Sequence, residues 1–185
     1  MRSDPLADFV QRLEGIVAQG DRDESVVLGE VKHAMQALVS RDDWLPETFT
    51  RPDPQYYRQY LLHADPDDRF CVVSFVWGPG QQTPIHDHCA WGVIGMLRGA
   101  EVTTSFSESA SGMRQGEELT LRPGDVAVVG PVVGDIHKVR NAYDDRVSIS
   151  IHAYGTNIGK QTRHVFDAAS GARKDFVSCY SNSAP

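Results

Sequence analysis

From residue 70 onward the chain is a succession of short runs rich in β-branched residues, punctuated by glycine and proline. Such runs at roughly regular intervals are typical of an antiparallel barrel or sandwich. A polar stretch at 107–118, SESASGMRQGEE, is predicted to form a surface hairpin loop. The predicted strands are FCVVSFVW at 70–77, WGVIGMLRG at 91–99, EVTTSFS at 101–107, EELTLRPGDVAVV at 117–129, HKVRN at 137–141 and DRVSISIHAYG at 145–155.

The segment before these runs has a helical period instead. Asp4 and Pro5 form an N-cap and first-turn pair, and apolar residues follow them at helical spacing. A second helix is predicted to start near Asp23 or Ser25, with one apolar face. These patterns predict two or three helices within about 1–60.

A chain of 185 residues is long enough to bury a sizeable core within one compact domain. We therefore expect a single domain over 1–185, with the helical segment first and a β-barrel over about 68–170. The tail at 179–185 is expected to fray.

A net charge of −7 disfavours binding to nucleic acid or to an anionic membrane surface, although small anionic substrates need only one or two local cations. The first ten residues lack the apolar run of a signal peptide, and no window approaches about 18 apolar residues. Cys71, Cys89 and Cys179 have no disulfide-framework spacing. These features predict a cytoplasmic protein with no nucleic-acid or membrane partner, and they leave its oligomeric state open.

The strongest chemical signal is Gly80 followed, after five residues, by His86, Asp87 and His88. Residues two apart in a strand project to the same face, so both histidines can bind one ion while the aspartate points away. A second glycine-framed segment supplies His137. The two segments together predict one metal ion held by His86, His88 and His137.

These two segments resemble the two cupin motifs. The resemblance implies a mainly β fold, a cupin (RmlC-like jelly-roll) β-barrel with two or three N-terminal α-helices. The usual first cupin motif has a glutamate ligand shortly after its second histidine, but here 89–93 reads CAWGV. The next acid is Glu101, which is expected to pair structurally with Arg98 and receives no catalytic assignment.

A centre without a carboxylate has chemical consequences. Three neutral imidazoles leave the full dipositive charge on a divalent metal, which favours an anionic co-ligand. Three protein ligands on one side also leave open positions opposite, as catalysis requires. Zinc would fit three histidines as well, so the spacing alone does not name the metal.

Ser150, His152 and Tyr154 occupy alternate positions in SISIHAYG and share one face of a predicted strand. Ile149 and Ile151 lie on the other face. A hydroxyl, an imidazole and a phenol in line can form a relay in which the serine orients the histidine and the histidine polarises the phenol. The row is either exposed to solvent or directed into a polar cavity.

The HDH segment, the later single histidine and S-x-H-x-Y together resemble the thiol dioxygenases, the cysteine dioxygenase superfamily. The similarity covers about 55–170 and points to the bacterial branch typified by 3-mercaptopropionate dioxygenase. It is carried by QYLLHADP, FVWGPGQQTPIHDHCAWGVIGMLRGAE and IHAYGTNIGKQTRHVF.

The resemblance implies one non-haem Fe(II) per chain on the three histidines, with O2 and a small thiol carboxylate as substrates. The thiolate and dioxygen meet at the iron, and both oxygen atoms are added to sulfur to give a sulfinic acid. Ser150, His152 and Tyr154 match the outer-sphere catalytic triad of that family, and this favours the inward-facing orientation of the row.

The same resemblance assigns two substrate-binding residues. Mammalian cysteine dioxygenases hold the substrate carboxylate with an arginine, and the matching position here is Gln59, as in the bacterial enzymes. Arg163, in GKQTRHVF, is the best match to the later arginine that holds the carboxylate in the bacterial branch. Because Arg58 adjoins Gln59, a shift of one residue would exchange their roles.

Mammalian family members also carry a cysteine that crosslinks to the triad tyrosine. Val93 stands at the matching position, five residues after His88. Tyr154 is therefore expected to be uncrosslinked, with Cys89 as a small buried residue that points away from the metal.

Several substrates and one other class of function stay open. The order of preference is 3-mercaptopropionate, mercaptosuccinate and L-cysteine; mercaptosuccinate would need a second cation, such as Arg58 or Arg69. A non-oxygenase metal cupin, an isomerase, hydrolase or small-molecule-binding protein, would explain the three histidines but not the Ser150–His152–Tyr154 row. Consumption of O2 separates the two classes.

Overall fold

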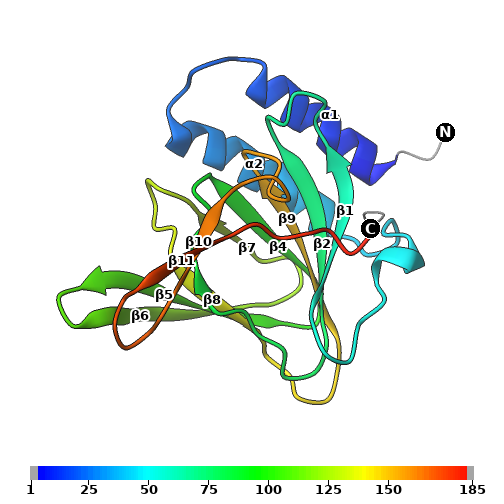
Figure 1. Cartoon of the computed structure of the whole chain (residues 1–185). Coiled ribbons are helices and arrows are strands. Elements are labelled where there is room, and N and C mark those ends of the chain that lie inside the picture. Colours follow the sequence, from blue (N-terminus) through cyan, green and yellow to red (C-terminus); the bar gives the residue numbers. More distant parts are fainter. Residues whose placement is uncertain (1–3, 183–185) are drawn as a thin grey trace.

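A computed structural model describes residues 4–182 (Figure 1). Two helices and one short 3-10 helix precede eleven strands: α1 (Pro5–Val17), α2 (Glu24–Val39), η1 (Glu47–Phe49), β1 (Arg58–Ala64), β2 (Cys71–Trp77), β3 (Ile85–His86), β4 (Gly92–Arg98), β5 (Glu101–Ser109), β6 (Gly112–Leu121), β7 (Val126–Val129), β8 (His137–Asn141), β9 (Ser148–Tyr154), β10 (Arg163–Phe166) and β11 (Arg173–Phe176). The predicted mainly β architecture is confirmed.

The two predicted helices begin where their capping residues are. The Asp4 carboxylate accepts hydrogen bonds from the backbone N–H groups of Leu6 and Ala7, with Pro5 in the first turn. Asp23 caps α2 by accepting from the N–H of Ser25. Each cap satisfies backbone donors that the helix itself leaves unpaired. Among the described residues, no helix combines the length and apolarity needed to traverse a bilayer.

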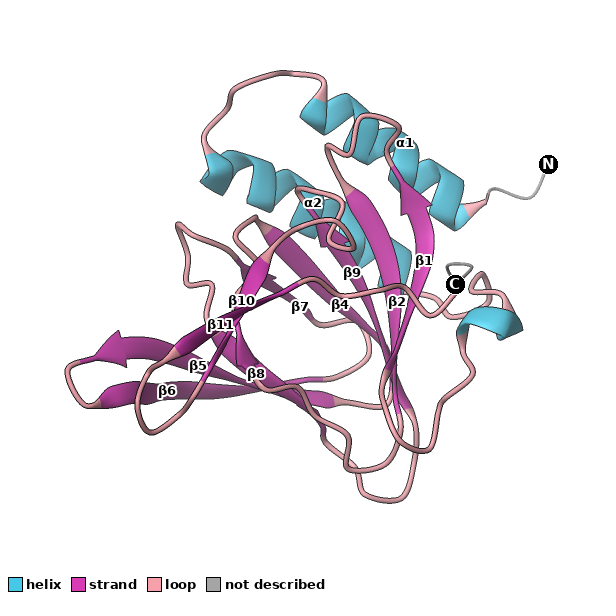
Figure 2. Ribbon diagram, viewed as in Figure 1, coloured by secondary structure: helices cyan, strands magenta, loops and turns pink. Residues whose placement is uncertain are grey.

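The strands form two antiparallel sheets, ordered β1-β2-β9-β4-β7 and β11-β10-β3-β8-β5-β6. Within residues 4–182 these sheets are separate ladders, so the predicted barrel is a jelly roll of two sheets (Figure 2). The strands span Arg58 to Phe176, and the sheet-forming part is therefore longer at both ends than predicted. In particular, QYYRQYLLH contributes β1, which pairs with β2.

The polar segment at 107–118 is a correction to the sequence prediction. It forms a hairpin as expected, but most of it is strand: β5 continues to Ser109 and β6 resumes at Gly112. Only two residues lie in the turn, and Gly112 adopts a φ of 107° that glycine accommodates readily. The β5–β6 hairpin projects away from the rest of the molecule (green in Figure 1).

Both helices cover the outer face of the first sheet (Figure 2). A Cβ on Gly95 of β4 would lie 2.7 Å from the Met35 side chain, so the glycine lets α2 lie close against the sheet. On β9, Ile149 and Ile151 join this core. Because side chains alternate along a strand, the row that begins at Ser150 faces the other way, into the space between the two sheets.

The C-terminal segment lies along β1, contrary to the expectation that it frays. Ser181 donates its N–H to the Gln59 carbonyl over 2.7 Å, and its Oγ accepts from the Gln59 N–H over 2.9 Å. The Asn182 side chain makes the corresponding pair of bonds with Leu61. Residues 183–185 of the predicted fraying tail lie outside the described residues.

Candidate active site

His86, His88 and His137 converge as the sequence predicts. His86 on β3 is the register partner of His137 on β8, and His88 follows β3 directly. One ring nitrogen of each lies within 4.8 Å of the others, and all three residues are buried. Asp87 points away, as expected, and accepts hydrogen bonds from the N–H and Nδ1 of His164.

Each ring has a hydrogen-bond partner at Nδ1. His86 Nδ1 lies 3.0 Å from the Pro84 carbonyl oxygen, and His88 Nδ1 lies 2.9 Å from Asp135 Oδ1. These bonds leave Nε2 of the rings available to a metal, and they fix both the tautomer and the ring orientation. For the third ring, Nδ1 of His137 is 3.0 Å from the Thr103 hydroxyl.

Asp135 and Thr103 were not identified from the sequence. Asp135 also accepts from the backbone N–H groups of His88 and Cys89, so one carboxylate fixes the turn that follows β3. Although burial raises the pKa of Asp135, the hydrogen bond and charge of His88 lower it overall. The sequence does contain one indication of Asp135, because this residue directly follows Gly134 in the second glycine-framed segment.

The electrostatic environment keeps two of these imidazoles, those of His86 and His137, neutral. Burial, and then the neighbouring His88, lowers the pKa of His86 to about 3, and burial lowers the pKa of His137 well below its usual value. A neutral imidazole is the form that binds a metal. The cluster contains no carboxylate, so its donor set of three ring nitrogens fits a divalent ion that keeps open positions for other ligands.

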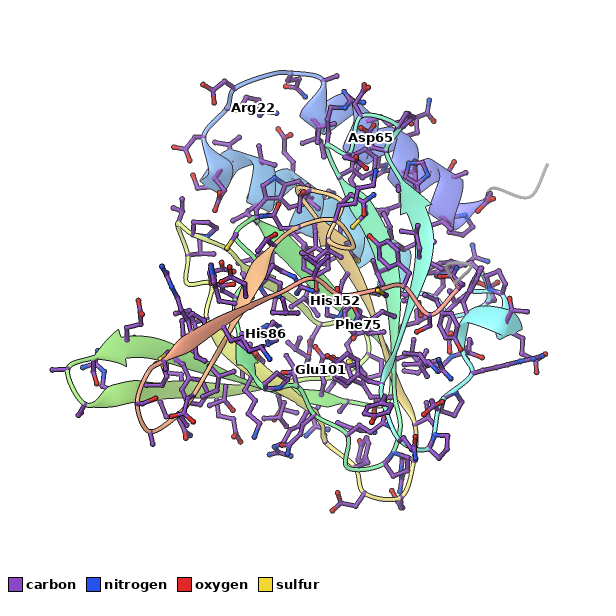
Figure 3. The ribbon with its side chains drawn as sticks, in the orientation of Figure 1. Arg22, Asp65, Phe75, His86, Glu101 and His152 are labelled. Carbon is purple, nitrogen blue, oxygen red and sulfur yellow. The ribbon has the colours of Figure 1, made fainter. Side chains whose placement is uncertain are left out.

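Ser150, His152 and Tyr154 form a continuous hydrogen-bonded row. Ser150 Oγ is 2.8 Å from His152 Nε2, and His152 Nδ1 is 2.8 Å from the Tyr154 hydroxyl. All three are buried, so the inward-facing orientation is confirmed. Trp77 donates its indole N–H to Ser150 over 3.1 Å, and Phe75 stacks on the His152 ring at 4.1 Å between centroids (Figure 3).

This row lies beside the histidine cluster and carries no charge. The rings of His88 and Tyr154 stack at 5.3 Å. Burial lowers the pKa of His152 well below its usual value, and burial raises the pKa of Tyr154. At neutral pH the row therefore consists of a neutral imidazole between two hydroxyl groups, each of which can donate or accept.

A cavity of about 430 Å³, counted with its open mouth, brings the predicted residues together. It is lined by the three histidines, by His152 and Tyr154, and by both predicted substrate-binding residues, Gln59 and Arg163. Arg163 is buried, donates to Ser178 Oγ over 2.6 Å and lies 4.5 Å above the Phe176 ring. Its Nε has no hydrogen-bond partner among the described residues.

The cavity also has an aromatic wall. Trp77 is buried and lines the cavity. Tyr57 and Phe75 were not identified, because an aromatic residue near a strand gives no sequence signal for the cavity it faces. Burial raises the pKa of Tyr57.

Some sequence expectations are wrong. Arg98 does not pair with Glu101: its Nε binds Asp42, at 2.6 Å from the nearer oxygen, and Glu101 is completely buried without that partner. A register shift in β4 between Met96 and Arg98 is the physical reason, because it reorients the arginine. Cys89 is exposed rather than buried, since the chain turns there with a φ of 53°.

The residue beside Tyr154 is Gly92, not Val93. Gly92 is the register partner of Tyr154, and a Cβ there would lie 3.0 Å from the tyrosine ring. Val93 instead belongs to the core under the helices. The absence of a crosslink to Tyr154 stays a prediction.

The fold and site together define a cupin with a candidate metal centre, in which two antiparallel sheets hold three buried histidines beside a small cavity. The comparison with protein families narrows this class. The chain belongs to the cysteine dioxygenase type I family, whose model matches residues 1–179. Members of this family are thiol dioxygenases, and the protein is therefore an oxidoreductase that uses O2.

Two curated relatives are themselves named as cysteine dioxygenases. Cysteine dioxygenase type 1 of Danio rerio is 25% identical over 195 residues, which cover 100% of this chain and 92% of that protein. The Homo sapiens enzyme is 28% identical over 171 residues, covering 90% of this chain and 80% of that protein. A Klebsiella pneumoniae protein with a double-stranded β-helix domain superposes with a TM-score of 0.48 at 15% identity, covering 70% of this chain and 91% of that chain.

Proposed function

We propose that this protein binds one Fe(II) on His86, His88 and His137 and oxidises a small thiol carboxylate, best matched by 3-mercaptopropionate, to its sulfinic acid. The observation that carries the proposal is one small cavity lined by three imidazoles that could hold a metal, a phenol and a single buried guanidinium. When bound, Fe(II) would supply the open positions and the electrons that bring thiol and dioxygen into reaction.

Arg163 is the residue that holds the substrate carboxylate in this proposal. Its guanidinium is buried, and its free Nε offers an unused donor for a bidentate pair with a carboxylate. Phe176 and Ser178 restrict its rotation, so the arginine is preorganised. Gln59 lines the same cavity and can donate or accept beside the substrate.

The charge of the lining favours a monocarboxylate. Arg163 is the one cation among the described residues that line the cavity. Arg58 and Arg69, the candidates for a second carboxylate of mercaptosuccinate, form ion pairs with Asp53 and Asp65 instead. The described lining also contains no carboxylate to balance the ammonium group of cysteine. These features support 3-mercaptopropionate over the other two thiols.

The row of Ser150, His152 and Tyr154 orients a proton donor toward the reacting atoms. The imidazole holds the phenol through a 2.8 Å hydrogen bond, and the serine holds the imidazole on its other side. The phenol keeps its proton because its pKa is raised by burial. In this proposal the Tyr154 hydroxyl donates a hydrogen bond to the substrate or to dioxygen. A bound dioxygen is thereby held against the substrate sulfur.

The same features weigh against a non-oxygenase cupin. An isomerase or binding protein would need the three histidines but would give the buried row no task. We further propose a single cupin domain in the cytoplasm, since the three cysteines are free, as expected in a reducing compartment. Neither nucleic acid nor membrane is a partner in this proposal.

The test is oxygen consumption by the Fe(II)-loaded chain with 3-mercaptopropionate, mercaptosuccinate, L-cysteine and cysteamine. We expect one O2 per thiol, a sulfinic acid product, and the highest kcat/KM for 3-mercaptopropionate. Arg146→Gln, an exposed arginine paired with Asp145, is a matched control and leaves this order unchanged. Product formation without O2, or no oxidation of any of these thiols, would refute the proposal.

A further inference from the structure

Glu101 is a completely buried carboxyl group that the proposed function does not use. It is the first residue of β5, and its side chain lies in the interior below Phe75 and His152 (Figure 3). Neither of its oxygens completes a hydrogen bond with a described residue, although the Ser150 hydroxyl and the Trp77 indole are near enough to act on this carboxyl group. Because an unpaired buried carboxyl group is costly, its presence in the interior calls for a reason.

The neighbours of Glu101 include Ser150, which is the end of the hydrogen-bonded row opposite Tyr154. Burial raises the pKa of Glu101 to about 7, while the Ser150 hydroxyl and the Trp77 indole lower it in part. No cation contributes to this pKa. Across β5 its register partners are Asn141 of β8 and Leu121 of β6, and neither titrates.

The other groups near Glu101 leave Ser150 as its natural partner. The amide nitrogen of Asn141 already donates to backbone carbonyls, including that of Trp77, and its oxygen accepts from Ser148. Burial is the main cause that raises the pKa of Tyr154, and a charge on Glu101 also raises it. The structure thus connects Glu101 to the phenol at the opposite end of the row.

The protons that these groups carry allow two arrangements of the hydrogen bonds along this row. The Trp77 indole can only donate, so Ser150 accepts from it in both. If Glu101 is a neutral acid, it donates to Ser150, Ser150 donates to His152 Nε2, and His152 Nδ1–H donates to Tyr154. The phenol proton is then free to point into the cavity.

An ionised Glu101 reverses the direction of the three hydrogen bonds that link Glu101, Ser150, His152 and Tyr154, while the bond from Trp77 is unchanged. Ser150 donates to the carboxylate, His152 carries its proton on Nε2, and Tyr154 donates to Nδ1. Each proton transfer along the row breaks one N–H or O–H bond and forms an N–H or O–H bond on the next group. The row has one proton fewer, and that proton leaves at the Tyr154 end, into the cavity. In this arrangement the phenol oxygen can only accept from a ligand.

We propose that Glu101 is a positioning residue whose neutral form directs the Tyr154 hydroxyl into the cavity and whose ionised form turns it away. The consequence for catalysis rests on the proposed function, because it requires Tyr154 to donate to substrate or dioxygen. The consequence for the tautomer of His152 does not.

The test reads that tautomer directly. The full chain, with isotope-labelled histidine and loaded with diamagnetic Zn²⁺, is followed by nitrogen NMR across the pKa of Glu101. We expect the wild-type His152 proton to move from Nδ1 to Nε2 as pH rises. Glu101→Gln, a neutral donor of similar shape, keeps Nδ1–H throughout. Glu117→Gln, an exposed acid on β6, is the control and behaves as wild type.

The Fe(II)-loaded proteins provide the second readout. Above the pKa of Glu101 we expect wild-type kcat to fall by about tenfold per pH unit, while Glu101→Gln keeps its low-pH kcat. Glu101→Leu, which has no titrating group, serves if the glutamine variant does not fold, and its tautomer is independent of pH. A wild-type tautomer that does not change with pH, or one that still changes in these variants, would overturn the proposal. Absence of thiol oxidation in all proteins would refute only the proposed function.

Discussion

The Tyr154 hydroxyl and Nδ1 of His152 lie 2.8 Å apart, and the ring of the same tyrosine stacks on that of His88 at 5.3 Å. One residue therefore joins the relay to the histidine cluster. The phenol is buried, and among the described residues its oxygen has one hydrogen-bond partner, so its other side is open to a ligand in the cavity.

We expect Tyr154→Phe to keep iron bound but to lower kcat by about a hundredfold, since a positioned proton donor contributes on that order. Sulfinate formed per O2 consumed should also fall. Iron content by metal analysis and product by chromatography separate the two effects. A variant indistinguishable from wild type would remove the relay from the mechanism.

We expect His137→Ala to lose iron retention and activity together, because two imidazoles remain of a site built from three. Asp135→Asn is the milder change: it weakens the carboxylate bond to His88 Nδ1 and should lower metal affinity by about tenfold to a hundredfold. Equilibrium metal titration measures both. Full iron occupancy in the alanine variant would contradict the ligand assignment.

We expect Arg163→Gln to raise KM for 3-mercaptopropionate by about tenfold to a hundredfold, the effect of losing a hydrogen bond to a charged group. The poor substrate cysteamine, which has no carboxylate, should show no such change. Steady-state kinetics with the two thiols makes the comparison. An equal loss for both would mean that the arginine supports the fold instead of the carboxylate.

We expect the Glu101→Gln variant to become more stable relative to wild type as pH rises. Burial raises the pKa of Glu101 from 4.5 to about 7, so the folded state favours the neutral acid. That stabilisation is complete below pH 4.5 and is lost as pH rises through about 7. The difference should reach on the order of 3 kcal/mol, measured by urea unfolding at several pH values. A constant difference would show that Glu101 titrates normally.

Strand alternation was sufficient to place Ser150, His152 and Tyr154 on one face of a strand, and the family resemblance indicated that this face points inward. Ile149 and Ile151 were placed on one face and the Ser150–His152–Tyr154 row on the other, and the structure confirms both. The three histidines converge as predicted although β3 contains only Ile85–His86, because Asp135 fixes the turn that carries His88. Their binding of a metal stays a prediction.

The wrong and the missing predictions concern features that depend on the local backbone and on the register in which strands pair. Whether Arg98 faces Glu101 is decided by a bulge in β4, and no local residue pattern marks that bulge. Thr103 reaches His137 only because β5 pairs with β8 in one particular register. Cys89 is exposed because a left-handed backbone conformation follows the metal-binding segment, where alternation no longer applies.

The pairing of the C-terminal segment with β1 gives the two proposed substrate-binding residues a common anchor. Ser181 is bonded to the backbone of Gln59, and Ser178 to the side chain of Arg163. Detaching this stretch of chain would free both at once, so under the proposed function substrate affinity is expected to depend on residues that do not line the cavity. A bulky fusion or a cleavage at this end of the protein is therefore expected to weaken thiol recognition while leaving iron in place.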